Sequence, residues 1–152
     1  MLEASKVGTA NEEQQVALAA ARRMAEQIQE QTFSDVFYLY NSDPGDDPGG
    51  VGTAQGAGFL VEGLSSRSGD ADGVVGRIAF PSASLGGSAV SLREDVSVPA
   101  LGTPRDLNGD GLVDTLDHSA DYIVLPVSVH IEWVGAAGNL SAELHLLLAN
   151  GS

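Results

Sequence analysis

Alternating apolar and polar residues run through Val127-Ser-Val-His-Ile-Glu-Trp133 and again through Leu140-Ser-Ala-Glu-Leu-His-Leu146. A period of two is typical of β-strands with one buried face. Pairing residue 134 with residue 139, across the turn Gly135-Ala-Ala-Gly138, puts both apolar rows on one face, with Trp133 opposite Leu140. The two segments therefore predict an antiparallel hairpin that closes the domain, with Trp133 pointing inward.

The opposite face of this hairpin is polar and holds two of the three histidines. In the predicted register His130 faces Glu143, and His145 lies on the same side. A cross-strand polar pair on a solvated face accounts for this arrangement without a catalytic role.

An amphipathic helix is predicted from Asn11 to about Gln31. Asn11 is suited to cap it. Apolar residues recur every four positions, and alanines widen this stripe: Val16, Ala20, Met24 and Ile28, with Ala17, Ala21 and Ala25 beside them. A hydrophobic stretch continues to Tyr40, so the helical region covers about 11–40 and a loop and β region covers 41–152.

The order of elements predicts an α+β fold. Short extended segments are expected at Ala57 to Glu62, Val74 to Phe80 and Ala89 to Val98, with long Gly-rich loops between them. A helix followed by an antiparallel sheet buries its apolar stripe on the apolar face of the sheet. We expect one domain that includes all of residues 1–152.

The segment Asp106-Leu-Asn-Gly-Asp-Gly-Leu-Val-Asp-Thr-Leu-Asp117 has the spacing of an EF-hand-like calcium loop. Gly111 falls at the sixth position, where such a loop turns sharply, and the position-12 residue is Asp instead of Glu. The alternative is an Asx/Gly-rich surface turn without a metal. The predicted ligands of a Ca²⁺ ion are the side chains at positions 1, 3, 5, 9 and 12 and the backbone carbonyl at position 7: Asp106, Asn108, Asp110, Asp114, Asp117 and Leu112.

The flanks of this loop predict a structural role for the calcium ion, which would hold a long loop in place and not act as a conformational switch. A sensor EF-hand needs a helix on each side, but two prolines precede this loop, and an extended segment follows it from Tyr122. There is no second copy of the loop in the chain. The expected dissociation constant is about 10⁻⁵ to 10⁻³ M, as in extracellular modules.

Composition excludes several classes of function. The net charge of −14, with only 7 Lys and Arg among 152 residues, argues against a basic surface for nucleic acid or anionic lipid. The absence of cysteine excludes disulfides, thiolate metal sites and a cysteine nucleophile. Nucleophile-elbow, Walker, zinc-protease and dinucleotide-binding motifs are also absent from the sequence. We therefore expect no enzymatic activity, and a hydrolase would require a buried acid that no pattern nominates.

Three stretches together resemble the globular part of type IV pilin-like proteins, either minor pilins or type II secretion pseudopilins. They are Asn11-Glu-Glu-Gln-Gln-Val-Ala-Leu-Ala-Ala-Ala-Arg-Arg-Met-Ala-Glu-Gln-Ile, the Gly-rich loops leading to Ile78-Ala-Phe-Pro81 and Leu92-Arg-Glu-Asp95, and the closing hairpin. The resemblance implies a non-catalytic subunit of a pilus-like or secretion filament. It also implies that the subunit contacts other pilin-like subunits through its N-terminal helix, and that calcium stiffens the loop beside the sheet.

In that family an apolar segment begins the helix, anchors the subunit in the inner membrane and then packs in the filament core. The family's leading Phe, its Glu at the fifth position and that apolar run are not found here, so we expect them upstream, with Met1-Leu-Glu3 added by a vector. The expected location is the cell envelope or an extracellular filament. The alternative is a calcium-stabilised extracellular adhesion or carbohydrate-binding module, against which the inward Trp133 argues because it leaves no aromatic platform.

Overall fold

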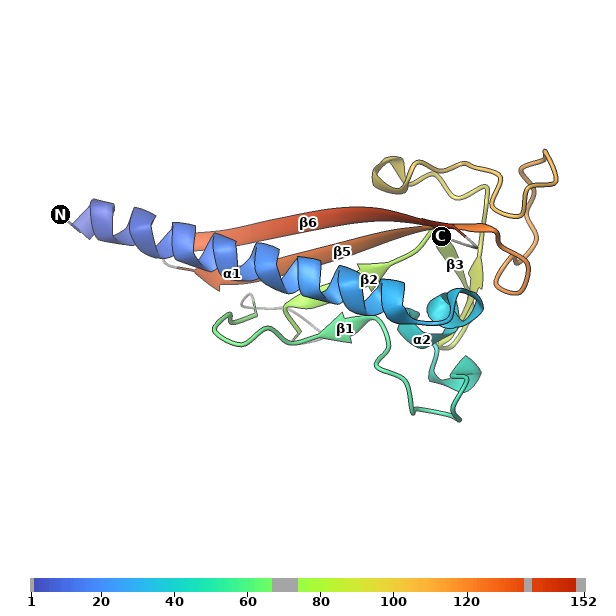
Figure 1. The fold of residues 1–152 in the computed structure, drawn as a ribbon, viewed down its shortest axis with the longest axis horizontal. Coiled ribbons are helices and arrows are strands. Elements are labelled where there is room, and N and C mark those ends of the chain that lie inside the picture. Colours follow the sequence, from blue (N-terminus) through green and yellow to red (C-terminus); the bar gives the residue numbers. More distant parts are fainter. Residues whose placement is uncertain (1, 67–73, 136–137, 150–152) are drawn as a thin grey trace.

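A long helix lies along one face of an antiparallel sheet in the computed structural model, which describes residues 2–66, 74–135 and 138–149 (Figure 1). The mixed α+β class is therefore confirmed. Four strands form the sheet in the order β1-β2-β5-β6, and all neighbours are antiparallel. Their bounds are Gly58–Phe59 for β1, Gly76–Ala79 for β2, Val124–Gly135 for β5 and Gly138–Ala149 for β6.

A second sheet has two strands, β3 (Ser82–Gly86) and β4 (Ala89–Leu92). Strand β3 was not predicted from the sequence, and the segment around β4 was predicted to extend too far, to Val98. The polar residues of β3 hid it from a search for apolar alternation, and β4 ends where the chain enters the long loop before β5. The helical elements are α1 (Leu2–Glu30), α2 (Val36–Tyr40), and the 3₁₀ turns η1 (Phe33–Asp35), η2 (Pro44–Asp46) and η3 (Pro99–Leu101).

The register of the closing hairpin is confirmed residue by residue. Trp133 pairs with Leu140, Val129 with Leu144, and His130 with Glu143. Both strands extend further than predicted, and Ala136 and Ala137 of the expected turn lie outside the described residues. The side-chain period of two sets this register, because a shift by one residue would expose the apolar row of β5.

The prediction that the first helix begins at Asn11 was wrong. Helix α1 begins at Leu2, so Asn11 lies inside it instead of capping it, and α1 ends at Glu30 before a separate short helix, α2. Once a helix has nucleated, each added residue costs little, and Leu, Glu, Ala and Lys before residue 8 are good helix formers. No apolar periodicity marks these turns.

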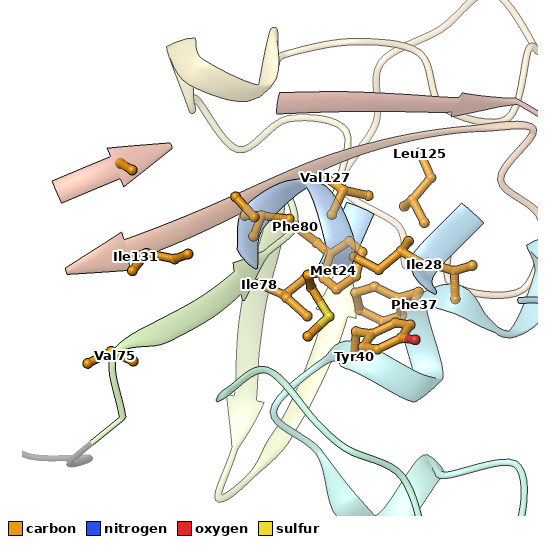
Figure 2. Packing of buried hydrophobic residues seen from close by; sticks show 14 of the residues in the cluster. Met24, Ile28, Phe37, Tyr40, Val75, Ile78, Phe80, Leu125, Val127 and Ile131 are labelled. Carbon is orange, nitrogen blue, oxygen red and sulfur yellow. The ribbon is translucent and has the colours of Figure 1, made fainter. Parts of the chain in front are cut away.

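The helix stripe that meets the sheet is the predicted one except at Val16. Ala17, Ala21, Met24 and Ile28 are buried as part of the core, whereas Val16 is 42% exposed. Small alanine side chains let the helix backbone approach the strands closely, so they take the contact in place of Val16. In Figure 2, Met24 and Ile28 lie beside Phe37 and Phe80, with Val127 of β5 close by.

A polar contact joins the helix to β5, near the hairpin end of the sheet. Trp133 is fully buried, as predicted, and its Nε1 donates a hydrogen bond to Glu13 Oε2 at 2.9 Å. Gly135 makes room for that carboxylate, because a Cβ on residue 135 would lie 1.9 Å from Glu13 Oε2. The helix position along the sheet is therefore tied to one indole and one glycine.

Glu13→Ala is expected to lower the free energy of unfolding by about 1–3 kcal/mol, because it leaves a buried indole N–H without its acceptor. Urea denaturation followed by tryptophan fluorescence measures both the stability and the indole environment. Glu12→Ala, which removes the neighbouring exposed carboxylate, is the matched control and should change the stability little. Equal effects of the two substitutions would contradict the proposed importance of this bond.

No helix among the described residues combines the length and the apolar character needed to cross a bilayer.

Candidate metal centre

The predicted calcium loop lies in the long segment between β4 and β5, at one end of the main sheet (Figure 1). Backbone bonds attach this segment to the end of β4 and to the residues that follow: His118 N donates to Leu92 O at 2.8 Å, and Arg105 N donates to Glu94 O at 3.0 Å. Residues 104–123 contain no helix or strand, and β5 begins at Val124. The expectation that helices do not flank the loop is confirmed.

The first residue of the loop holds its turn closed. Asp106 Oδ1 accepts from Gly109 N at 2.9 Å, and Asp106 Oδ2 accepts from Gly111 N at 2.8 Å. These bonds, the Gly111 one foremost, stabilise the carboxylate and lower the pKa of Asp106. The sharp turn predicted at Gly111 is confirmed by its φ of 84°, a left-handed conformation that favours glycine.

The third and fifth residues of the loop are neighbours. Asn108 Oδ1 accepts from Asp110 N at 3.3 Å, and Asp110 Oδ1 accepts from Leu112 N at 2.9 Å. The Asn108 amide also donates to Asp121 Oδ2 at 3.2 Å. Asp110 is exposed, as is the side chain of Leu112.

A fully buried carboxylate, Glu94, lies against the middle of the loop and was not among the predicted ligands. Glu94 Oε2 accepts from Leu107 N at 2.5 Å, and Glu94 Oε1 accepts from Asp114 N at 3.2 Å. Burying a carboxylate is costly unless hydrogen bonds or opposite charge compensate it. Glu94 therefore depends on this loop, and the loop takes part of its shape from Glu94.

His118 is the positive group of the cluster. Its Nε2 lies 2.7 Å from Asp114 Oδ1 and 3.1 Å from Glu94 Oε1, and its Nδ1 lies 2.9 Å from Asp121 Oδ1. Burial disfavours the charged imidazolium, but the bonds to Asp114 and Asp121 and the charge of Glu94 outweigh it and raise the pKa of His118 to about 9. The bond from His118 in turn lowers the pKa of Asp114.

Side-chain oxygens within this cluster are close enough to share one cation. Glu94, Asp106 and Asp110 each offer an oxygen within 4.8 Å of the other two. Glu94, Asp114 and His118 form a second group at the same spacing, in which His118 offers a ring nitrogen. Calcium–oxygen distances are about 2.3–2.6 Å, so two ligands on one ion lie at most roughly 5 Å apart. The all-carboxylate group fits a hard cation such as Ca²⁺, whereas the second group already places an imidazole between two carboxylates.

The structure brings some of the predicted ligands together and gives others different partners. Asp106 and Asp110 share the first group, and Asn108 borders it through its bond to Asp110 Oδ2 at 3.4 Å. Asp114 faces His118. Asp117 Oδ1 accepts from Leu92 N at 2.9 Å, so its carboxylate is bonded to the end of β4.

The sequence alone did not point to two residues of this centre. Glu94 precedes the loop by twelve residues, and one acid among 21 Asp and Glu carries no distinguishing signal. His118 directly follows the predicted loop, and nothing in the sequence marks it as buried. It is only 2% exposed and contacts three carboxylates.

The other two histidines are on the outer face of the hairpin, as predicted. His130 pairs across the strands with Glu143, and its Nε2 lies 2.8 Å from Glu132 Oε1. Both histidines are more exposed than His118.

Comparison of the chain with protein-family models, with curated proteins and with solved structures finds no match in any of the three. The function is therefore inferred from the geometry of the site and from the sequence pattern.

Proposed function

We propose that this protein is a non-catalytic structural subunit of a type IV pilus-like or type II secretion filament. The observation that carries the proposal is the arrangement of α1, a 29-residue helix that packs lengthwise on an antiparallel sheet. Its first turns project beyond the strands in Figure 1. In such an arrangement the later turns of the helix pack on its own sheet, and the first turns would contact neighbouring subunits.

The packing of α1 supports this division of roles. The helix residues that contribute to the core begin at Ala17, and Glu13, about one turn earlier, accepts the hydrogen bond from Trp133. The turns before Glu13 extend away from the core, where other pilin-like subunits would contact them. The filament would lie in the cell envelope or outside the cell, and the membrane anchor of the family would be supplied by residues preceding these.

We further propose that a calcium ion binds in the loop 106–117 and stiffens the segment between β4 and β5. The support is the filled spacing of the loop together with the mutual distances of Glu94, Asp106 and Asp110. Glu94 adds a carboxylate from outside the loop to the predicted set. The ion would offset the repulsion among these acids and hold a long, otherwise irregular segment against the sheet.

The proposal is tested by sequencing the N-terminus of the full-length protein from its native source. The expected result is a processed Phe with Glu at the fifth position and about 20 apolar residues, long enough to cross a bilayer. An ordinary secretory cleavage site, or another globular domain upstream, would overturn the filament proposal. The calcium-stabilised adhesion or carbohydrate-binding module would then be the better account.

A further inference from the structure

The last strand, β6, forms a long open edge of the main sheet. It has 12 residues and pairs with β5 on one side, and no other strand among the described residues pairs with it. In Figure 1 it is the outer rim of the sheet, on the side away from β1. Sheets often protect such edges with charged side chains, above all lysine, with proline or with a bulge. Residues 138–149 contain no lysine or proline, Glu143 is their one acidic residue, and their register with β5 is continuous.

The apolar layer of the sheet is also incomplete at this edge. Every inward residue of β5 from Leu125 to Trp133 is fully buried. On β6 only Ala142 is buried, whereas Leu144, Leu146 and Leu148 are half-buried although they share the inward face. A further strand beside β6 would therefore bond to its edge and cover these leucines.

The sequence of β6 is complementary to itself. Glu143 and His145 lie on the outer face of β6, whereas Leu144, between them in the sequence, faces inward. If two copies of β6 pair antiparallel about a two-fold axis at Leu144, Glu143 of each copy faces His145 of the other, and Leu144 faces its own equivalent. An axis at residue 143 or 145 would put Glu143 or His145 opposite its own equivalent. An axis between two residues would put outward-facing side chains opposite inward-facing ones.

We propose that the β6 edge, over Ser141–Leu147, is an interface for a second copy of this chain. The two four-stranded sheets would join into one continuous sheet with both α1 helices on the same face. This contact is isologous, so it differs from the head-to-tail contacts that build a filament. It does not depend on the proposed filament function.

A cysteine test exploits the absence of native cysteine. Directly opposite residues in an antiparallel pair have Cα atoms about 4.5–5.5 Å apart, within the range for a disulfide. Under mild oxidation Leu144→Cys is expected to form a covalent dimer by itself. Ser141→Cys alone should stay monomeric, and it should cross-link when mixed with Leu147→Cys. Self-cross-linking of Ser141→Cys that matches or exceeds that of Leu144→Cys would overturn the proposed register.

Sedimentation equilibrium tests the association itself. The wild-type chain is expected to dimerise, and Leu147→Lys should shift it toward monomer by putting a charge on the edge. Leu85→Lys, at a similarly exposed leucine of β3, is the matched control and should leave dimerisation unchanged. Glu143→Lys should weaken the dimer, and adding His145→Glu should restore it. A wild-type chain that remains monomeric up to about 1 mM, with circular dichroism showing it folded, would overturn the proposal.

Discussion

Glu94→Ala is expected to lower the free energy of unfolding by about 3–5 kcal/mol, the usual cost of breaking a buried, paired charge. The carboxylate is fully buried, accepts from the backbone of Leu107 and Asp114, and lies 3.1 Å from His118 Nε2. Without it, the backbone N–H groups of Leu107, Asn108 and Asp114 lose this acceptor, and His118 loses one of three neighbouring carboxylates. The segment between β4 and β5 should then separate from the sheet before the rest of the protein unfolds.

Two further variants make this experiment specific. Glu94→Gln keeps the side-chain size and one oxygen, so it should recover part of the loss, although its amide donor would face a backbone N–H. Asp95→Ala removes the neighbouring carboxylate, whose bond to Arg93 Nε at 2.7 Å is partly solvent-exposed, and it should change the stability little. Urea denaturation in the presence of a chelator measures all three without a metal contribution. A loss for Glu94→Ala no larger than that for Asp95→Ala would contradict the structural role of Glu94.

Saturating Ca²⁺ is expected to raise the melting temperature of the wild-type protein. A ligand that binds only the folded state at a hundredfold excess over its dissociation constant stabilises it by about 2.7 kcal/mol. Asp110→Ala should remove this gain, because Asp110 is in the carboxylate group around Glu94. In chelator, Asp110→Ala should change the melting temperature little, since the side chain is exposed. Calorimetric titration and thermal melts in calcium and in chelator measure the effect.

Controls separate a specific site from general attraction of cations to an acidic protein. Glu62→Ala removes an exposed carboxylate on another part of the molecule and should leave the calcium gain unchanged. Mg²⁺ should stabilise less than Ca²⁺, because it demands near-octahedral geometry and loses its water reluctantly. Identical wild-type melts in calcium and in chelator, with no heat of binding in the titration, would rule out the site.

Loop spacing and side-chain distances assign different ligands to the calcium ion, and Asp117 is one residue at which they differ. Loop spacing makes it the twelfth-position ligand, whereas its carboxylate accepts from Leu92 N across 25 residues of sequence. If it acts mainly through that bond, Asp117→Asn should lower the stability by the same amount with and without calcium. A loss confined to the calcium-loaded protein would place it among the ligands.

Local pattern was enough to predict the hairpin and its register. Successive side chains on a strand point to opposite faces, so the apolar residues of β5 and β6 can share a face in few ways. The turn at Gly111 could also be predicted from the sequence, because it is a local feature: Asp106 accepts hydrogen bonds from residues three and five positions away. Helix α1 was predicted only where its apolar period is visible, and its first turns were missed because helix propensity extends them without burial.

The sequence by itself thus determined the α+β class, the inward Trp133 and the acidic loop, because each follows from the geometry of neighbouring residues. Only the tertiary structure decided that Glu94 meets both the loop and His118, that Asp117 bonds to β4, and that Val16 stays exposed beside the buried stripe of α1. These contacts join residues that periodicity does not relate. They form because burying a carboxylate or an apolar stripe is favourable only when another element supplies the matching donors or surface.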